Sequence, residues 1–188
     1  ALLTLTMAAS LAGCDSKPAD EPTKSPETMI ESAVDFYTEV WDALGEDRQF
    51  AAVGGDAEHE AEAPAKFAMT DENKETFEYL LHVNDELYDM LDDDTATLQH
   101  MMNTNTFSSA FAKLKDTSKA EEFAEDYKAE IQGQHWMCGF PDKVVVISVA
   151  DYVMMAYGAE ECVDDLVEAC SEVAPDSTVL VDAPAVLD

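Results

Sequence analysis

The chain has 188 residues, of which 41 are acidic and only 10 are lysine or arginine, so its formal net charge at pH 7 is −31. This excess first excludes a nucleic-acid binder, because phosphate neutralisation needs clustered basic side chains and Arg48 is the only arginine. A basic amphipathic surface for anionic lipid is excluded for the same reason. Hydrophobic residues make up 47% of the chain, which suffices for a core, and the length predicts one domain with appendages.

Residues 1–13 are apolar and uncharged, and they end in small side chains, as export signals do. The segment is shorter than the roughly 20 residues that a membrane-spanning helix needs. It lacks a basic start, so we expect the signal to be truncated there. The segment ends in Leu11-Ala12-Gly13, and Cys14 follows directly. These four residues resemble the lipobox of bacterial lipoproteins.

The lipobox resemblance implies that the chain is cut between Gly13 and Cys14, and that Cys14 carries a diacylglycerol and a further acyl chain such as palmitate. Several acyl chains anchor firmly, so the mature protein would be tethered to a membrane of the bacterial cell envelope and face the periplasm. Asp15 resembles the signal that retains enteric lipoproteins on the inner membrane, which favours the inner over the outer membrane. Residues 14–24 are polar, contain two prolines and predict a flexible tether that reaches about 35 Å.

Residues 25–175 are predicted to form an all-α domain, a helical bundle of about five to six helices with short connections. Ser25 is the expected N-cap of the first helix, and Gly45 is its expected end. Apolar side chains spaced by three and four residues predict the other helices. The expected helices cover residues 25–44, 70–91, 95–102, 106–114, 118–132 and 159–173.

The apolar run of residues 144–157 has two interpretations. Its first six residues alone suit a buried strand. The whole run is longer than a typical strand and ends at Gly158, which favours a central helix buried on all sides. Residues 46–69 have the composition of a loop whose length predicts mobility or a function. Residues 176–188 are expected to run as an extended tail over the bundle.

If Cys14 is acylated, Cys138, Cys162 and Cys170 remain in an oxidising compartment, where two of them are expected to pair. Cys162 and Cys170 lie eight residues apart on one predicted helix, about 12 Å by helical rise, which is too far for a disulfide. If the segments 143–157 and 159–173 form an antiparallel helical hairpin, Cys170 returns beside Cys138. A Cys138–Cys170 disulfide is therefore predicted, with Cys162 as a small buried residue.

The same loop supports a second interpretation, a periplasmic protein that binds copper or zinc. His135, Met137 and Cys138 offer an imidazole, a thioether and a thiolate, which are soft donors suited to Cu(I). The segment His100-Met101-Met102 could add further donors. No pair of ligands stands at a recognised metal-binding spacing, so the structural interpretation is favoured and no cofactor is predicted.

Two acidic clusters are expected to be solvated surface. Residues 58–62 begin like a zinc protease motif, but Ala63 stands where the second histidine should be. Residues 92–94 lack the alternating ligands and the glycine of a calcium loop. His82 is expected to be a hydrogen-bonded histidine beside the apolar stripe of its helix, and Asn84 to fix helix register or to meet a polar neighbour.

The sequence contains no nucleophile elbow, no phosphate-binding loop and no haem attachment motif. The favoured function is therefore a lipid-anchored, non-catalytic binding or structural module, and an enzyme without a recognisable motif is the third alternative. The acidity predicts adaptation to a saline habitat, because salt screens the self-repulsion of the chain. A cationic protein or peptide partner is the competing explanation.

Overall fold

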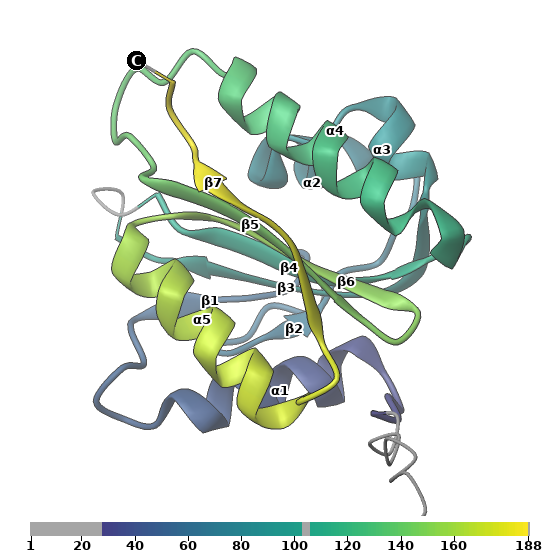
Figure 1. The fold of residues 1–188 in the computed structure, drawn as a ribbon, viewed down its shortest axis with the longest axis vertical. Helices are drawn as coiled ribbons and strands as arrows, with labels where there is room; N and C mark the ends of the chain where they lie inside the picture. Colours follow the sequence, from purple (N-terminus) through teal and green to yellow (C-terminus); the bar gives the residue numbers. More distant parts are fainter. Residues whose placement is uncertain (1–27, 103–105, 188) are drawn as a thin grey trace, which may run out of the picture.

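The computed structural model describes residues 28–102 and 106–187, and it shows a single antiparallel sheet with helices on both faces (Figure 1). The strand order is β1-β3-β4-β6-β5-β7, and β2 pairs with β3 outside this path. The fold is therefore mixed α/β, and the predicted all-α helical bundle is wrong. The helices are α1 (Ala33–Leu44), α2 (Lys74–Leu81), α3 (Asp85–Asp89), α4 (Ala120–Gly133) and α5 (Glu160–Val173). The strands are β1 (Ala52–Val53), β2 (Ala65–Lys66), β3 (Leu91–His100), β4 (Ser108–Leu114), β5 (Lys143–Val149), β6 (Tyr152–Gly158) and β7 (Thr178–Pro184).

The predicted central helix over residues 144–157 is a β-hairpin. Strands β5 and β6 pair along their whole length and are joined by the two-residue turn Ala150-Asp151. Every residue of β6 is buried, because helices cover both faces of the sheet. A strand buried on both faces shows no polar alternation, so its pattern resembles that of a buried helix. Ala150 adopts a left-handed backbone conformation (φ 51°). Glycine or asparagine usually occupies such a turn position, so alanine here gives no indication of a hairpin in the sequence.

The predicted helices over residues 95–102 and 106–114 are strands as well. Residues 95–100 belong to β3, and β4 pairs antiparallel with them. The β-branched side chains of Thr95 and Thr97 are buried in this strand, as β propensity favours. The acidic residues 92–94 lie where the register shifts, so they form an irregularity in the strand.

The sheet separates two hydrophobic cores. Helices α1 and α5 cover one face, and α2, α3 and α4 cover the other (Figure 1). Alternate residues of β6 supply both cores, because successive side chains of a strand point to opposite faces. Met154 and Ala156 belong to the first core, whereas Met155 and Tyr157 belong to the second. The predicted tail forms β7, which pairs with β5 at one edge of the sheet.

The long loop before α2 is held by a buried carboxylate. Asp56 is only 5% exposed, and its oxygens accept hydrogen bonds from the backbone of Glu58, His59 and Ala68. The imidazole of His59 lies 2.8 Å from the same carboxylate. The segment that begins like a zinc protease motif is therefore a turn ordered around Asp56.

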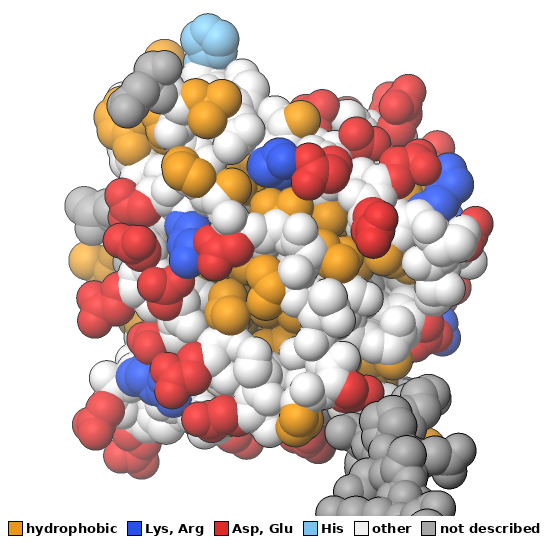
Figure 2. All heavy atoms as spheres, viewed as in Figure 1, with side chains coloured by type: hydrophobic (Ala, Val, Ile, Leu, Met, Phe, Trp, Pro, Cys, Tyr) orange, Lys and Arg blue, Asp and Glu red, His pale blue; other side chains and the backbone are white. Residues whose placement is uncertain are grey.

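Acidic side chains dominate the surface shown in Figure 2, and basic side chains lie beside them. Lys143 contacts both Asp164 and Asp182, at 2.5 and 3.0 Å. Within residues 28–102 and 106–187, no helix is both long enough and apolar enough to span a membrane. The predicted signal segment, Gly13, Cys14 and the tether 14–24 lie outside the described residues.

Candidate functional site

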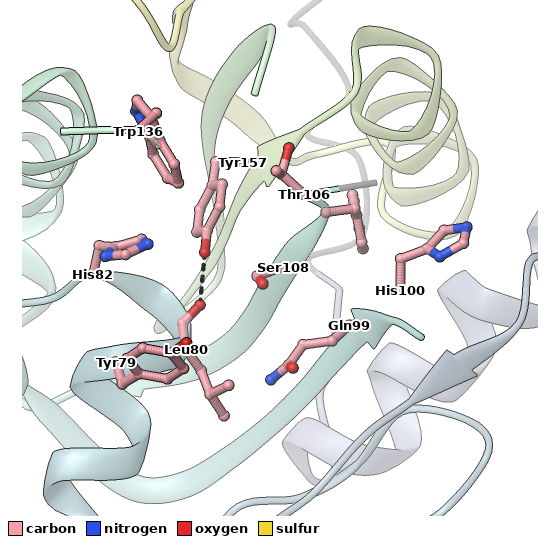
Figure 3. Close-up of a pocket in the computed structure, with 10 residues that line it drawn as sticks. Tyr79, Leu80, His82, Gln99, His100, Thr106, Ser108, Trp136 and Tyr157 are labelled. Atoms are coloured by element: carbon pink, nitrogen blue, oxygen red, sulfur yellow. Dashed lines mark hydrogen bonds between the residues drawn. The ribbon is translucent and has the colours of Figure 1, made fainter. Parts of the chain in front are cut away.

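A cavity of about 370 Å³ lies at one end of the sheet. Its floor is a row of residues paired across three strands, in which Gln99 of β3 faces Ser108 of β4, and Ser108 faces Tyr157 of β6. Figure 3 shows these side chains directed into the same space. The row exists because the three strands are in register, which brings Tyr157 beside Ser108 although the two lie far apart in the sequence.

The side wall comes from the end of α2 and the loop after α4. His82 ends α2 in a left-handed conformation (φ 53°, ψ 36°), which turns the chain away directly after the last helical turn. Tyr79, in that last turn, is 78% exposed and lies at the mouth of the cavity. Trp136 stands opposite, on the loop between α4 and β5 (Figure 3).

Three rings of the wall form one aromatic cluster. The ring centroids of His82 and Trp136 are 4.9 Å apart, and each of these rings lies 5.4 Å from Tyr157. The hydroxyl of Tyr157 donates to the carbonyl of Leu80 at 2.9 Å, which joins β6 to α2. This bond holds the cluster in place, and burial raises the pKa of Tyr157 to about 12, so its hydroxyl stays protonated.

His100 stands at the opposite rim of the cavity, at the end of β3 (Figure 3). Its Nδ1 accepts a hydrogen bond from the backbone of Met102 at 2.9 Å, so a neutral ring carries its proton on Nε2. Phe50 stacks on the imidazole with centroids 4.7 Å apart, which fixes the plane of the ring.

The cavity is uncharged in a strongly acidic protein. None of the described residues that line it is Asp, Glu, Lys, Arg or Cys. Burial lowers the pKa of His82 and of His100 below the usual histidine value, so both imidazoles are neutral at pH 7. The walls thus offer ring surfaces and neutral hydrogen-bonding groups, which are suited to holding an organic molecule.

The residues predicted to bind a metal lie beside this pocket and outside its lining. His135, Met137 and Cys138 all lie on the loop between α4 and β5 and are exposed, Met137 to 88%. In the described part of the chain, no group of three or more His, Cys, Asp or Glu side chains could hold a metal ion. Copper or zinc binding by these three residues stays a prediction.

The predicted Cys138–Cys170 disulfide is wrong. Cys138 is exposed on its loop, whereas Cys170 is buried between α5 and the opposite face of the sheet, and both are free thiols. The prediction required residues 143–157 to be a helix antiparallel to α5, and this segment is a β-hairpin. Burial raises the pKa of the Cys170 thiol to about 12, which makes it unreactive.

One residue of the acidic cluster 92–94 has a structural role. Asp94 accepts a hydrogen bond from the backbone of Ala33 in the first turn of α1, and another from the hydroxyl of Tyr152. A carboxylate is favourable at this position because a helix N-terminus carries unpaired N–H groups. Asn84 also has a defined role, since its side chain caps α3 and bonds Glu130 of α4.

Most of the pocket does not follow from the sequence patterns. Two lining residues stand out in the sequence, His82 as an expected hydrogen-bonded histidine on a helix and His100 as a possible metal donor. Trp136 was passed over between His135 and Met137. A useful signal would have been the aromatic and small polar residues at predicted strand ends, but this signal requires the strands to be recognised first.

The fold and the site define a three-layer α/β/α protein with an aromatic, uncharged pocket at one end of its antiparallel sheet. Comparison with known proteins found no match, either among family models, among curated proteins or among solved structures. The geometry of the pocket is therefore the basis on which a function can be argued.

Proposed function

We propose that this chain is a non-catalytic binding lipoprotein of the bacterial cell envelope, which is anchored through Cys14 and takes a small organic ligand into the aromatic pocket. The cavity of about 370 Å³ carries the proposal, because its size and its ring-lined, uncharged walls are typical of small-molecule sites. Among the described lining residues, no hydrogen bond joins either imidazole to a hydroxyl that it could activate, and His100 Nδ1 accepts from the backbone of Met102 instead, which favours binding over nucleophilic chemistry.

The position of the pocket supports a periplasmic ligand. Near the start of the described chain, the backbone N–H of Thr28 donates to Asp176 at 2.9 Å, shortly before β7. The first residue of β7, Thr178, pairs with Ser148 beside the turn of the β5–β6 hairpin. Tyr157 lies near the other end of this hairpin, about 13 Å along β6 from Val153, the partner of Ser148. An anchor at Cys14 would therefore join the domain at the end of the sheet remote from the pocket, so the attachment would not block the pocket.

The anchor is tested by labelling cells that express the full chain with radioactive palmitate and then separating their membranes. We expect the wild-type chain to carry label and to sediment with the membranes, and Cys14→Ser to lose both properties. Cys138→Ser is the matched control and should behave as wild type, because its exposed thiol is not part of the lipobox. A wild-type chain without label would contradict the anchor.

The pocket is tested by ligand-observed NMR with a panel of small neutral, cationic and anionic molecules. We expect at least one compound to bind the wild-type chain and to lose binding in Trp136→Leu, which removes one wall of the cavity. His135→Ala changes the exposed neighbour of Trp136 and should leave binding intact. If no compound distinguishes Trp136→Leu from the wild type, the binding function is wrong.

A further inference from the structure

We propose that the ligand of this pocket is an organic cation without N–H groups, a methylated ammonium compound with a polar tail, held by the ring cluster of His82, Trp136 and Tyr157. This inference rests on the proposed binding function and specifies its ligand class. A cation is attracted to the face of an aromatic ring when it lies within about 6 Å of the ring centroid. The three centroids are at most 5.4 Å apart, so a cation beside the cluster can lie within that range of more than one ring.

The net charge of the protein favours a positively charged ligand. A formal net charge of −31 produces a negative potential that repels anions and raises the local concentration of cations. None of the described residues that line the pocket is a lysine or an arginine. The neutral imidazoles of His82 and His100 add no positive charge that would repel a bound cation at pH 7.

The walls also select the kind of cation. A metal ion such as Ca²⁺ requires several oxygen ligands, and a primary ammonium or a guanidinium group prefers carboxylates that accept its hydrogen bonds. The described lining contains no carboxylate. A fully methylated ammonium group donates no such hydrogen bonds and is bound through ring surfaces instead, so it leaves no hydrogen bond unmade in this pocket.

The remaining space fits a polar tail. The floor row places the amide of Gln99 and the hydroxyl of Ser108 beside Tyr157. Thr106 lies on the same side of the cavity as Ser108 (Figure 3). These groups can both donate and accept hydrogen bonds, which suits a hydroxyl or a similar neutral group a few atoms from the cation. Tyr79, which is mostly exposed at the mouth, is placed to cover the bound ligand.

The test compares four probes by isothermal titration of the full wild-type chain in about 0.5 M NaCl, where surface electrostatics are screened. Choline carries the methylated cation and a hydroxyl. 3,3-Dimethylbutan-1-ol has the same shape without the charge, ethanolamine has the charge without the methyl groups, and glucose is a neutral polar ring. We expect choline to bind at least about tenfold more tightly than any of the other three.

Variants locate the interaction. Trp136→Leu should weaken choline binding at least about fivefold, and Trp136→Phe, which keeps a ring, should restore part of the affinity. Tyr79→Leu should weaken binding less, because Tyr79 is at the mouth. His135→Ala is the matched control and should bind as wild type. Circular dichroism of each variant would confirm that the fold is retained.

The outcomes separate the ligand class from the binding function. If dimethylbutanol or glucose binds as tightly as choline and depends on Trp136, the pocket binds ligands but the cation proposal is wrong. If choline binds equally well to Trp136→Leu, the ring cluster is not its site. If choline does not bind at all, the cation proposal is overturned, whatever other ligand the NMR panel identifies.

Discussion

Asp56 orders a loop whose composition indicates no regular structure. Its carboxylate accepts backbone hydrogen bonds from Ala68 at 2.7 Å and from Glu58 at 2.9 Å, and it also contacts the imidazole of His59. Ala68 directly follows Phe67, which is fully buried in the second core. One carboxylate thus connects an exposed turn to the hydrophobic interior.

Replacing Asp56 by asparagine should lower the free energy of unfolding by about 1–3 kcal/mol, because buried N–H groups lose an ionised acceptor. Burial alone would raise the pKa of Asp56, but the hydrogen bonds from Ala68, His59 and Glu58 outweigh burial and lower it. A lowered folded-state pKa contributes stability above the unfolded-state pKa, and this contribution is lost as the pH falls through the folded value. The difference between the wild type and Asp56→Asn should therefore shrink between pH 7 and pH 3.

Urea unfolding at a series of pH values measures this difference. Glu58→Gln is the matched control, since it removes an exposed neighbouring carboxylate and leaves the backbone donors paired. A difference between the wild type and Asp56→Asn that stays constant with pH would show that the Asp56 charge does not order the loop.

Two tyrosines, Tyr37 of the first core and Tyr127 of the second, are both fully buried and differ in what their hydroxyls contact. The hydroxyl of Tyr37 bonds Ser109, whereas that of Tyr127 has no hydrogen-bond partner among the described residues. An unpaired buried hydroxyl costs free energy, and a paired one contributes about 1 kcal/mol. We expect Tyr127→Phe to leave stability unchanged or raise it by about 1 kcal/mol, and Tyr37→Phe to lower it by about the same amount. Thermal and urea unfolding of the two variants would check this, and equal losses would contradict it.

At the scale of elements, sequence patterns located most of the helices on the surface but not the sheet. The first helix was expected to start after Ser25 and to end at Gly45; it starts at Ala33, with Ser32 as its N-cap, and does end before Gly45. These helices have one polar and one apolar face, so the spacing of their apolar residues by three and four is visible in the sequence. Strands β5 and β6 have no polar face, so period alone could not distinguish them from a buried helix.

The site was hidden for a related reason. Gln99, Ser108 and Tyr157 are neighbours only because β3, β4 and β6 are paired in register. A sequence that is interpreted as helical places them on separate helices. Local patterns therefore predicted the surface helices, whereas the pocket depends on contacts between residues tens of positions apart.

The turn of the β5–β6 hairpin offers a direct test of the element that was misassigned. Ala150 has a left-handed backbone, which costs a residue with a Cβ about 1 kcal/mol relative to glycine. Ala150→Gly should therefore raise the free energy of unfolding by about 0.5–1 kcal/mol. The matched control is Ala129→Gly on the exposed face of α4, where glycine should lower stability by about 1 kcal/mol. Urea unfolding of both variants measures the sign, and destabilisation by Ala150→Gly would contradict the hairpin turn.

At the scale of the whole molecule, the excess of acid is not relieved by ion pairs. Arg48, in the turn after α1, contacts Asp165 and Glu168 of α5, and Lys143 contacts two further carboxylates. Most of the described basic side chains thus already have acidic neighbours, and the remaining carboxylates repel one another. The end of α5 adds to this cost, since its last turn has no basic residue to complement the helix dipole, whereas the guanidinium of Arg48 donates to the carbonyls of Ala43 and Leu44 at the end of α1.

We expect the free energy of unfolding in urea to rise markedly between about 10 mM and about 1 M NaCl, because the screening length falls from about 30 Å to about 3 Å. Glu172 lies exposed near the end of α5, where negative charge is unfavourable, whereas Glu161 lies in its first turn. Glu172→Gln should therefore raise stability by about 0.5 kcal/mol at low salt, and Glu161→Gln should lower it. Both effects should disappear at high salt, since each is electrostatic.

Equal stability at both salt concentrations would remove the saline explanation of the acidity. The competing explanation, a cationic protein or peptide partner, would then be favoured if a basic peptide bound the folded chain with an affinity that falls steeply with salt. The two explanations differ in what the salt acts on, because adaptation to salt changes the folding equilibrium of the chain alone, whereas a cationic partner changes only the equilibrium of the complex. Measuring unfolding and peptide binding in the same salt series therefore distinguishes them.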